Sequence, residues 1–352
     1  MTNTTMKAWT DKCAYLKRNG RRWLENTALE DVQRILVIRQ CAFGDYMAAR
    51  PFLVELRRLF PNAYLTLATV TSYRYAVPED LVDEVFVQDT RGTLAEQWRS
   101  LHELPPYDML FDLADTARSR LLTFLTTASI KLGFPYRPIF NHLLYDVGFR
   151  RTNYHYEAEV LLDFLKVMGH KPEYPLDFAM PWHLGSGADR VIAYFPFAST
   201  PDKSLSLDSW RQLIDEAAHT FSDYQHILLE GNKAEESGSF LNDVVAQHGN
   251  VSVQPCMELD SLAAWMARVS VLVCGDTGVR NLALATHTPT LGVFFKTLPY
   301  RYWPRYENFH EAVFRRDGSI PSSVDILPGL KALLLRQYPD RNQSWQAVGD
   351  SV

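Results

Sequence analysis

The stretch Val271–Phe295, VLVCGDTGVRNLALATHTPTLGVFF, decides the fold of this chain. Its pattern predicts a short apolar strand, Val271–Cys274, a sharp Gly-Asp-Thr-Gly turn, a helix, and a second strand, Thr290–Phe295. The turn places the unpaired backbone N–H groups after Thr277 at the positive end of a helix dipole, and such groups bind anions. The segment therefore predicts an α/β domain with an anion site.

Two residues of this turn suggest a bound ligand. Asp276 lies at the carboxyl end of the predicted strand, where open α/β sheets bind their ligands. Gly278 lets a phosphate approach the backbone without meeting a Cβ atom. An ordinary turn in which Asp276 caps the helix explains the same residues, so this segment alone leaves both interpretations open.

The composition is that of a soluble globular protein with two domains. The chain has 352 residues, of which 47% are hydrophobic and 22% are charged. A net charge of −5 argues against a nucleic-acid partner. The four cysteines are scattered without a Cys/His cluster, which fits a reducing compartment and no metal site. The chain lacks a signal-peptide core and a membrane-spanning apolar run, so we expect a cytoplasmic protein.

The first half of the chain predicts a doubly wound domain over residues 1–180. Arg34–Arg39 is an apolar strand, Pro51–Phe60 a helix and Tyr64–Val70 a second strand, which together form a βαβ unit. The other predicted strands are Glu84–Val87, Met109–Asp112 and Leu132–Phe134, and the other predicted helices are residues 6–28, Leu94–Leu101, Arg118–Thr127 and Tyr156–Met168.

Residues 6–28 combine many lysines and arginines with an aromatic stripe. A basic amphipathic helix can lie on an anionic membrane or reach a phosphorylated acceptor. A helix packed on its own domain through Trp9, Leu16 and Trp23 is the simpler alternative. Peripheral contact with the cytoplasmic face of the inner membrane stays open.

A run rich in proline and glycine, Pro172–Gly187, predicts a linker between two halves. Residues 188–325 follow as a second Rossmann-like domain, and residues 326–352 as a C-terminal helix and tail with Pro328 near the first turn. The remaining predicted elements are the strands Val191–Phe195, His226–Leu229 and Val251–Gln254 and the helices Ser209–Phe221, Glu235–His248, Leu259–Ala267 and Val324–Gln337. The predicted architecture is two Rossmann-like domains that face each other across a cleft.

Asp45 is the candidate for acid–base chemistry. The loop Gln40–Pro51 carries Gly44 and Asp45 between a predicted strand and a predicted helix. A carboxylate there can act as general base on a substrate hydroxyl, and a helix N-cap is the competing interpretation. The loop lacks the GxGxxG spacing, which disfavours a nicotinamide cofactor. It also lacks the spacing of a Walker A loop.

Two distant motifs resemble a known family. ILVIRQCAFGDYMAARPFLVELRRLFPNAYLTL, residues 35–67, resembles the opening of the glycosyltransferase family that includes the ADP-heptose:lipopolysaccharide heptosyltransferases. The later CGDTGVRNLALATHTPTLGVFF, with YRYWPR after it, is similar to that family's Asp-Ser/Thr-Gly signature and its trailing Trp-x-Pro-type segment. The order of elements matches over nearly the whole chain.

The resemblance implies a GT-B fold and metal-independent, inverting transfer of a sugar from a nucleotide-diphosphate donor, with no cofactor. It gives Asp45 the role of general base. It also implies that the loop Phe197–Lys203 holds the diphosphate and that an acidic residue after Gly231 holds the ribose. The implied donor-binding residues are Ser199, Thr200, Lys203, Glu235, Asp276, Thr277, Gly278, Arg280 and Asn281.

The chain departs from the family pattern at one helix start. Asn281 stands where members usually carry a histidine, and Arg280 adds a guanidinium that could grip a diphosphate or face solvent. The donor nucleotide and sugar therefore stay open, with an ADP-linked heptose as one possibility.

Three functions fit these residues. The first is a glycosyltransferase that acts on a glycan or glycolipid acceptor of lipopolysaccharide core, O-antigen or capsule. The second is a catalytically degenerate GT-B scaffold that is a partner in a polysaccharide-assembly complex, which the missing histidine would support. The third is a sugar-nucleotide epimerase, which would convert its donor without an acceptor.

Overall fold

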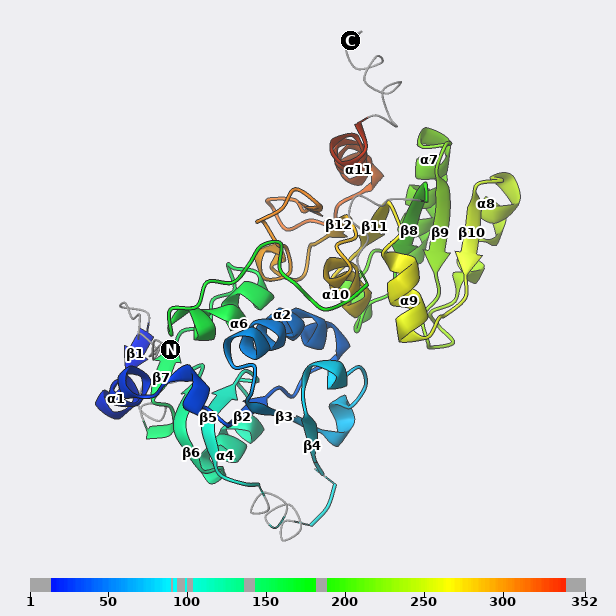
Figure 1. Cartoon of the computed structure of the whole chain (residues 1–352). Coiled ribbons are helices and arrows are strands. Elements are labelled where there is room, and N and C mark those ends of the chain that lie inside the picture. The colour runs from blue at the N-terminus through cyan, green and yellow to red at the C-terminus, as the bar shows by residue number, and fades with distance from the viewer. Residues whose placement is uncertain are drawn as a thin grey trace. The chain divides into compact units, whose positions relative to one another are not determined.

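The structure is a computed structural model, and it describes residues 14–89, 91–93, 99, 104–135, 143–181 and 189–339. The chain divides into two compact units. The N-terminal unit comprises Met1–Asn153 and Glu157–Ala179, and the C-terminal unit comprises Tyr154–Tyr156 and Met180–Val352. Each unit is an α/β sheet with helices packed on it (Figure 1).

The N-terminal unit contains a seven-stranded sheet in the order β1-β7-β6-β5-β2-β3-β4 among the described residues. All neighbouring strands are parallel except β1 and β7. The strands are β1 (Ala14–Leu16), β2 (Arg34–Ile38), β3 (Tyr64–Val70), β4 (Glu84–Gln88), β5 (Tyr107–Asp112), β6 (Ala128–Gly133) and β7 (Val147–Phe149). The helices are α1 (Arg18–Asn26), α2 (Phe43–Leu59), α4 (Ala117–Leu125) and α6 (Glu157–Lys166).

The C-terminal unit contains a parallel six-stranded sheet in the order β10-β9-β8-β11-β12-β13 among the described residues. Its strands are β8 (Val191–Phe195), β9 (Gln225–Leu229), β10 (Val251–Gln254), β11 (Val271–Cys274), β12 (Thr290–Val293) and β13 (His310–Val313). Its helices are α7 (Leu207–Thr220), α8 (Asn242–Gln247), α9 (Leu259–Met266), α10 (Gly278–Ala285) and α11 (Ser323–Gln337).

Apolar strands sit at the centre of both sheets because both of their faces are covered. Every residue of β8 and of β11 is buried, as parallel strands with helices on each face require. In the C-terminal unit α11 packs Ile326 and Leu330 into the same cluster as Trp210 of α7. The C-terminal helix therefore completes this core.

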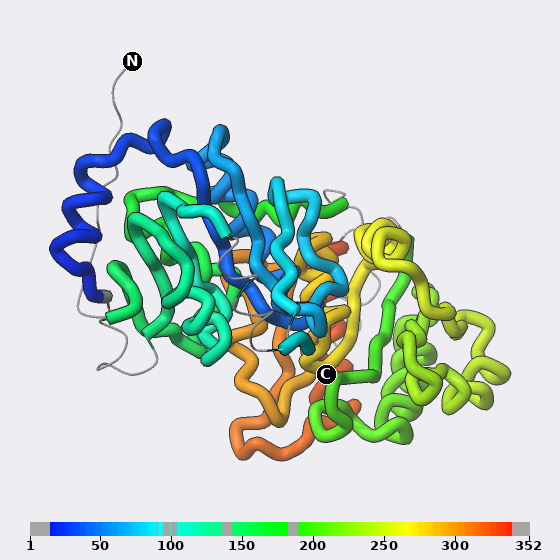
Figure 2. Tube along the Cα trace, turned by 90° about the horizontal axis from the view of Figure 1, so that it is seen from below, coloured from blue at the N-terminus to red at the C-terminus, as the bar shows by residue number. Residues whose placement is uncertain are grey.

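The predicted helix over residues 6–28 is confirmed only in part where the structure describes it. Residues 14–16 form β1, which pairs with β7, and only Arg18–Asn26 is helical; residues 6–13 lie outside the described part. Strand pairing overrides the local helical pattern, as tertiary contacts often do. The basic helix α1 lies beside the β7 end of the sheet (Figures 1 and 2).

Pro51 and Pro328 both lie inside helices, and only Pro51 is placed differently from the prediction. Pro51 does not start a helix but lies inside α2, which begins eight residues earlier at Phe43. Pro328 also lies inside its helix, α11, which begins at Ser323. An interior proline removes one helical hydrogen bond, and the burial of nearly the whole of α2 offsets that loss.

The predicted helix Glu235–His248 is also shorter. A 3-10 turn, Gly238–Leu241, precedes α8, and Glu235 stands before it in a loop. The carboxylate of Glu230 accepts hydrogen bonds from the backbone N–H of Gly238 (2.7 Å) and from Ser237, which fixes the loop outside a helix. The predicted helix Leu94–Leu101 falls almost wholly outside the described residues, and β7 and β13 were not predicted.

Candidate functional site

The strand order of each sheet reverses at one point. In the C-terminal unit the chain runs from β8 outward to β10 and then returns to place β11 on the other side of β8. In the N-terminal unit the same reversal falls between β2 and β5. Open α/β sheets bind their ligands at the carboxyl ends of the two strands beside such a reversal. These are the two places where candidate residues should gather.

Lys203 and Asp276 meet at the reversal point of the C-terminal unit. Lys203 ends a 3-10 turn after β8, and its Nζ lies 3.2 Å from Oδ2 of Asp276, which follows β11. The side chains are 28% and 12% exposed, so both retain some access to solvent. Gly275 makes the approach possible, because a Cβ atom there would lie 3.2 Å from the carbonyl oxygen of Lys203. The structure thus brings together two residues that lie far apart in the sequence.

The helix that follows, α10, begins without a side-chain cap. Thr277 is its N-cap residue in an extended conformation, and no side-chain hydrogen bond closes the first turn. The alternative in which Asp276 caps this helix is wrong, because the Asp276 carboxylate pairs with Lys203 instead. With Gly278 as first residue, the early N–H groups have no side-chain acceptor, which suits an incoming anion.

Arg280 and Asn281 lie in the first turns of α10 and are both buried. The Arg280 Nη1 donates to the carbonyl oxygen of Tyr302, and the guanidinium lies over the ring of Phe294, 5.2 Å from its centroid. Its Nε and Nη2 have no hydrogen-bond partner among the described residues. Burial lowers the pKa of Arg280. The guanidinium therefore does not face solvent, and its role in donor binding stays a prediction.

The other three predicted donor residues lie on exposed loops. Ser199 and Thr200 follow β8, and the Thr200 hydroxyl donates to the carboxylate of Asp202 (2.6 Å). Glu235 is exposed beyond β9. The acidic residue that is hydrogen-bonded in that loop is instead the half-buried Glu230, which was not predicted as a site residue although it directly follows a strand. These three remain predictions without a structural partner that supports them.

Asp45 lies near the reversal point of the N-terminal unit. It is the third residue of α2, with its side chain 36% exposed. The alternative that Asp45 caps the helix is wrong, because Ala42 is the N-cap residue. A partly exposed carboxylate on the first turn of a helix suits a group that must meet a substrate.

A buried cluster of charged groups adjoins Asp45. Arg39 follows β2 directly; its Nη1 donates to the carbonyl oxygen of Leu113 (2.5 Å), and its Nη2 lies 3.2 Å from Oε1 of Glu157 and 3.8 Å from Oδ1 of Asp45. Arg151 pairs with the same Glu157 carboxylate. Burial alone would lower the pKa of Arg39, but nearby negative charge, including Glu157 and Asp45, raises it. The sequence did not predict that this cluster, formed by Arg39, Glu157 and Arg151, adjoins Asp45.

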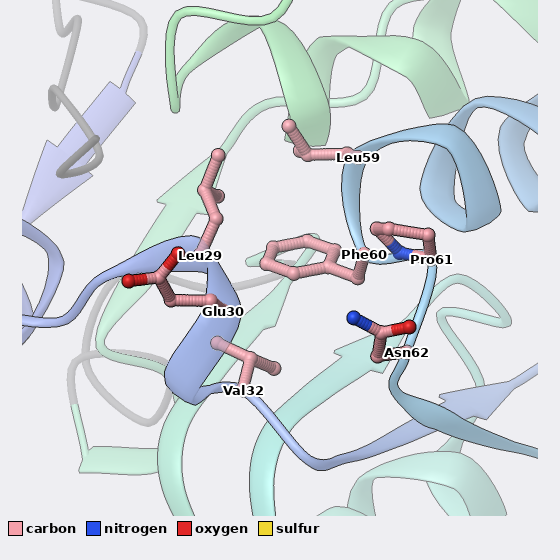
Figure 3. A pocket seen from close by; sticks show the side chains of 7 residues that line it. All are labelled: Leu29, Glu30, Val32, Leu59, Phe60, Pro61 and Asn62. Carbon is pink, nitrogen blue, oxygen red and sulfur yellow. The ribbon is translucent and has the colours of Figure 1, made fainter. Parts of the chain in front are cut away.

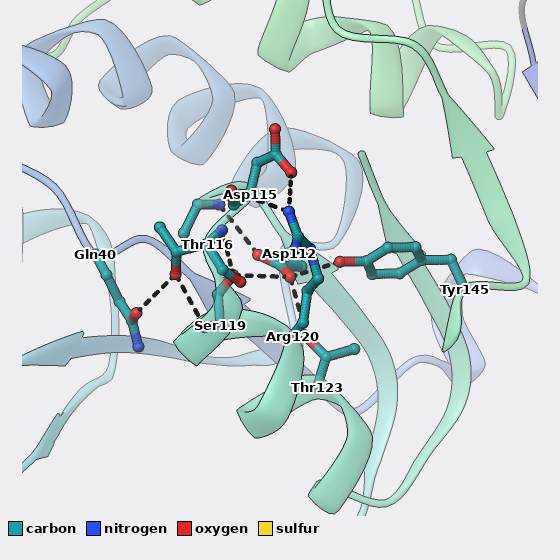
Figure 4. A network of polar contacts seen from close by, with 9 residues as sticks. Gln40, Asp112, Asp115, Thr116, Ser119, Arg120, Thr123 and Tyr145 are labelled. Atoms are coloured by element: carbon teal, nitrogen blue, oxygen red, sulfur yellow. Dashed lines mark hydrogen bonds and ion pairs between the residues drawn. The ribbon is translucent and has the colours of Figure 1, made fainter. Parts of the chain in front are cut away.

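A second buried network fixes the loop after β5 (Figure 4). The carboxylate of Asp112 accepts hydrogen bonds from the Tyr145 hydroxyl (2.7 Å) and the Ser119 hydroxyl (3.0 Å), and burial raises its pKa despite these donors. Thr116 caps α4 and points its hydroxyl at Gln40, 3.4 Å away, at the end of β2. The network therefore ties together the two strands beside the reversal point.

One pocket of about 270 Å³ lies elsewhere in the N-terminal unit (Figure 3). Its seven lining residues include Leu29 and Val32, which precede β2, and Phe60, which follows α2. That is the amino end of β2, whereas Asp45 follows its carboxyl end. The pocket is therefore separate from the candidate site.

No group of three or more His, Cys, Asp or Glu side chains is arranged to hold a metal ion in the ranges that the structure describes. In the same ranges, no helix has the length and apolar character needed to cross a membrane.

Comparison with known proteins agrees with the resemblance. The model of glycosyltransferase family 9 (heptosyltransferase) matches residues 95–317. Lipopolysaccharide heptosyltransferase 1 of Escherichia coli strain K12 is 23% identical over 289 residues, which cover 76% of this chain and 89% of that protein.

Solved structures share the fold. A family 9 glycosyltransferase from Veillonella parvula has a TM-score of 0.65 at 18% identity and covers 88% of this chain and 98% of its own. The E. coli heptosyltransferase WaaC with ADP-2-deoxy-2-fluoro heptose has a TM-score of 0.64 at 18% identity and covers 85% and 99%. The predicted fold class, GT-B with two Rossmann-like domains, is confirmed.

Proposed function

The chain belongs to glycosyltransferase family 9, and we propose that it moves a sugar, a heptose, from an ADP-linked donor to a bacterial surface glycan. That it is a glycosyltransferase of heptosyltransferase type follows from the family match. The donor and the acceptor are the parts that we add. The observation that carries the proposal is the pairing of Lys203 with Asp276 beside the uncapped start of α10.

The donor diphosphate suits the C-terminal reversal point. Transfer breaks the bond between the anomeric carbon and a phosphate oxygen, so negative charge grows on the departing nucleoside diphosphate. Lys203 and the first N–H groups of α10 can accept that charge by hydrogen bonding. We propose that these groups hold the diphosphate without a metal ion or a cofactor, and that Asp276 positions Lys203.

The acceptor reacts through a hydroxyl group, which needs a base. We propose that Asp45 takes the proton of that hydroxyl while its oxygen forms the new bond to the anomeric carbon and the diphosphate leaves with the bonding electrons. Attack from the side opposite the leaving group inverts the anomeric configuration. The partly exposed carboxylate of Asp45 supports this role.

The relatives support a proposal for the acceptor class. The E. coli protein is a lipopolysaccharide heptosyltransferase, so we propose lipopolysaccharide core as acceptor, with O-antigen and capsule as the other surface glycans to test. We further propose that the enzyme acts in the cytoplasm on the inner face of the inner membrane, with the basic helix α1 available for peripheral contact.

A degenerate scaffold is the second candidate. Asn281 replaces the histidine that the family usually carries at this helix start, and it is buried rather than presented to a ligand. A scaffold would keep the fold and lose nucleotide binding or turnover.

A transfer assay read by mass spectrometry tests these proposals. The protein is incubated with ADP-heptose, or with UDP-, GDP- and dTDP-sugars, and with lipopolysaccharide core acceptors, with and without EDTA. We expect a mass gain of one heptose on the acceptor that EDTA does not prevent. Nucleotide binding in a thermal-shift assay without transfer to any acceptor would favour the scaffold. Conversion of a donor without acceptor would favour an epimerase.

A further inference from the structure

We infer that Glu157 is a positioning residue for the reaction: through Arg39 it holds the carboxylate of Asp45 in place and sets how readily that carboxylate takes a proton. The inference rests on the proposed role of Asp45 as base. Glu157 itself does not meet the substrate, because it is 1% exposed.

Three elements converge on the Arg39 side chain. Arg39 follows β2, Asp45 lies in the first turn of α2, and Glu157 is the first residue of α6. The Arg39 Nη2 reaches Glu157 Oε1 at 3.2 Å and the Asp45 carbonyl oxygen at 3.4 Å, while Asp45 Oδ1 stays 3.8 Å away. The Nη2 group of Arg39 is therefore hydrogen-bonded more closely to Glu157, and its contact with the Asp45 carboxylate is a longer-range attraction.

The charges of this cluster balance only when Asp45 is ionised. Arg39 and Arg151 supply two positive charges, and Glu157 and Asp45 supply two negative charges. Cys41 adds no charge, because burial raises the pKa of its thiol to about 12. A general base acts in its carboxylate form, and in this cluster the Asp45 carboxylate shares its positive neighbour, Arg39, with Glu157.

Two neutral groups also contact Arg39. The Leu113 carbonyl accepts from Arg39 Nη1, and the Tyr46 hydroxyl lies 3.2 Å from the Arg39 carbonyl oxygen. Burial raises the pKa of Tyr46 above its usual value, so this phenol stays protonated. Arg39 is thus the charged group that Asp45 contacts among the described residues, and Glu157 links Arg39 to Arg151.

Glu157 has a consequence for the strength of the base. It competes with Asp45 for the Arg39 guanidinium and keeps that guanidinium from closing on Asp45. Without the Glu157 charge, Arg39 would pair fully with Asp45, which would hold the carboxylate ionised and turn it away from the acceptor hydroxyl. Without the Arg151 charge, Glu157 would neutralise Arg39 more completely, and Asp45 would take a proton more readily.

The test compares two variants whose effects have opposite signs. In Glu157→Gln we expect kcat to fall about tenfold to a hundredfold, with an unchanged donor Kd, and the acid limb of the kcat–pH profile to move to lower pH. In Arg151→Gln we expect that limb to move to higher pH. Opposite movements cannot come from a general loosening of the unit.

A matched control comes from the same unit. Glu55 is a buried glutamate near the middle of α2 that pairs with Arg58 and His170, so Glu55→Gln should lower the melting temperature and leave the shape of the pH profile unchanged. The inference would be overturned if the acid limb of the kcat–pH profile lies at the same pH in the wild-type protein, in Glu157→Gln and in Arg151→Gln. If Glu157→Gln does not fold, Arg151→Gln alone decides, because its side chain is less buried. Full turnover in Asp45→Asn would instead overturn the base assignment itself.

Discussion

The two units each bury an arginine near their reversal point, and they treat its charge differently. Arg39 in the N-terminal unit pairs with Glu157 and has Asp45 nearby, and negative neighbours raise its pKa although burial opposes this. Arg280 in the C-terminal unit bonds to a carbonyl oxygen and an aromatic ring and forms no salt bridge among the described residues, and burial lowers its pKa. The buried arginine of the N-terminal unit has carboxylates beside it, whereas Arg280 keeps two nitrogen atoms, Nε and Nη2, without a hydrogen-bond partner among the described residues.

This difference matches the two chemical tasks. A general base works best when its protonation state is set before the substrate arrives, so the protein surrounds it with fixed charges. A diphosphate brings its own negative charge, so the site that receives it can leave donors unpaired until binding. The following predictions test the comparison, from the largest expected effect to the smallest.

Asp45→Asn should lower kcat by about 10²- to 10⁴-fold, because it removes the proposed proton acceptor. The donor Kd from calorimetry should stay within about twofold, since the change lies in the N-terminal unit. Wild-type turnover in Asp45→Asn would show that Asp45 is not the general base, and the comparison would then not hold for the N-terminal unit.

Arg39→Met should destabilise the protein by about 3–5 kcal/mol, because Glu157 would then remain buried with half of its partners. Arg280→Met should cost no more than about 2 kcal/mol, since it removes a carbonyl hydrogen bond and a cation–π contact but also an unpaired buried charge. Urea unfolding measures both. Equal losses would contradict the proposed difference between the two arginines.

His226 makes the C-terminal unit sensitive to acid. Burial lowers its pKa from 6.5 to about 4, and its ring accepts or donates to Tyr194 and the Phe221 carbonyl. The folded protein favours the neutral form of His226. The free energy of unfolding is therefore highest above pH 6.5, and it falls by about 3 kcal/mol as the pH is lowered towards 4.

The pH dependence can be measured by urea unfolding between pH 7 and pH 4. His226→Gln should flatten the loss of stability over this range. His219→Gln, at an exposed position of α7, is the control and should keep the wild-type slope. If both variants keep that slope, His226 does not titrate as the structure indicates.

Lys203→Ala should weaken the binding of nucleoside diphosphate by about 10- to 100-fold, the usual worth of a charge-assisted hydrogen bond. Lys166→Ala is the matched control, because Lys166 also pairs with an aspartate, Asp163 (3.0 Å), at the solvent-accessible end of α6 in the other unit. The Kd for ADP is measured by calorimetry. Equal Kd values in the two variants would show that Lys203 does not bind the diphosphate.

Two helix starts in the C-terminal unit give the smallest contrast. Ser206 caps α7 by accepting from the Ser209 N–H, so Ser206→Ala should cost about 1 kcal/mol of stability. Thr277 makes no such bond at the start of α10, so Thr277→Ala should leave the stability nearly unchanged. We expect it to weaken ADP binding instead. A stability loss in Thr277→Ala like that of Ser206→Ala would mean that α10 has an ordinary cap.

The parallel strands were the most predictable part of the fold. Val191–Phe195, Tyr64–Val70 and Val251–Gln254 were predicted with the bounds that the structure gives them. Strands buried on both faces are short apolar runs between turns, and that signal is local. The strands β7 and β13 have only three and four residues and pair with β6 and β12, so each is too short to show a strand pattern in the local sequence.

The candidate site was predictable only where one motif contained it. The Gly-Asp-Thr-Gly turn and the loop of Asp45 could be read directly, because strand, turn and helix are consecutive in the sequence. Arg39 and Glu157 are 118 residues apart, and no spacing rule brings them together. A charged residue at the end of a buried strand, such as Arg39, is the one local signal that could have indicated a buried partner.

Gly292 links the buried arginine of α10 to the evolution of the family. A Cβ atom at this position of β12 would lie 2.5 Å from the ring of Phe294 and 2.9 Å from Nε of Arg280. Any side chain there would displace the guanidinium. Relatives that carry an arginine at the position of Arg280 should therefore carry a glycine at the position of Gly292, and the two positions should co-vary among homologous sequences.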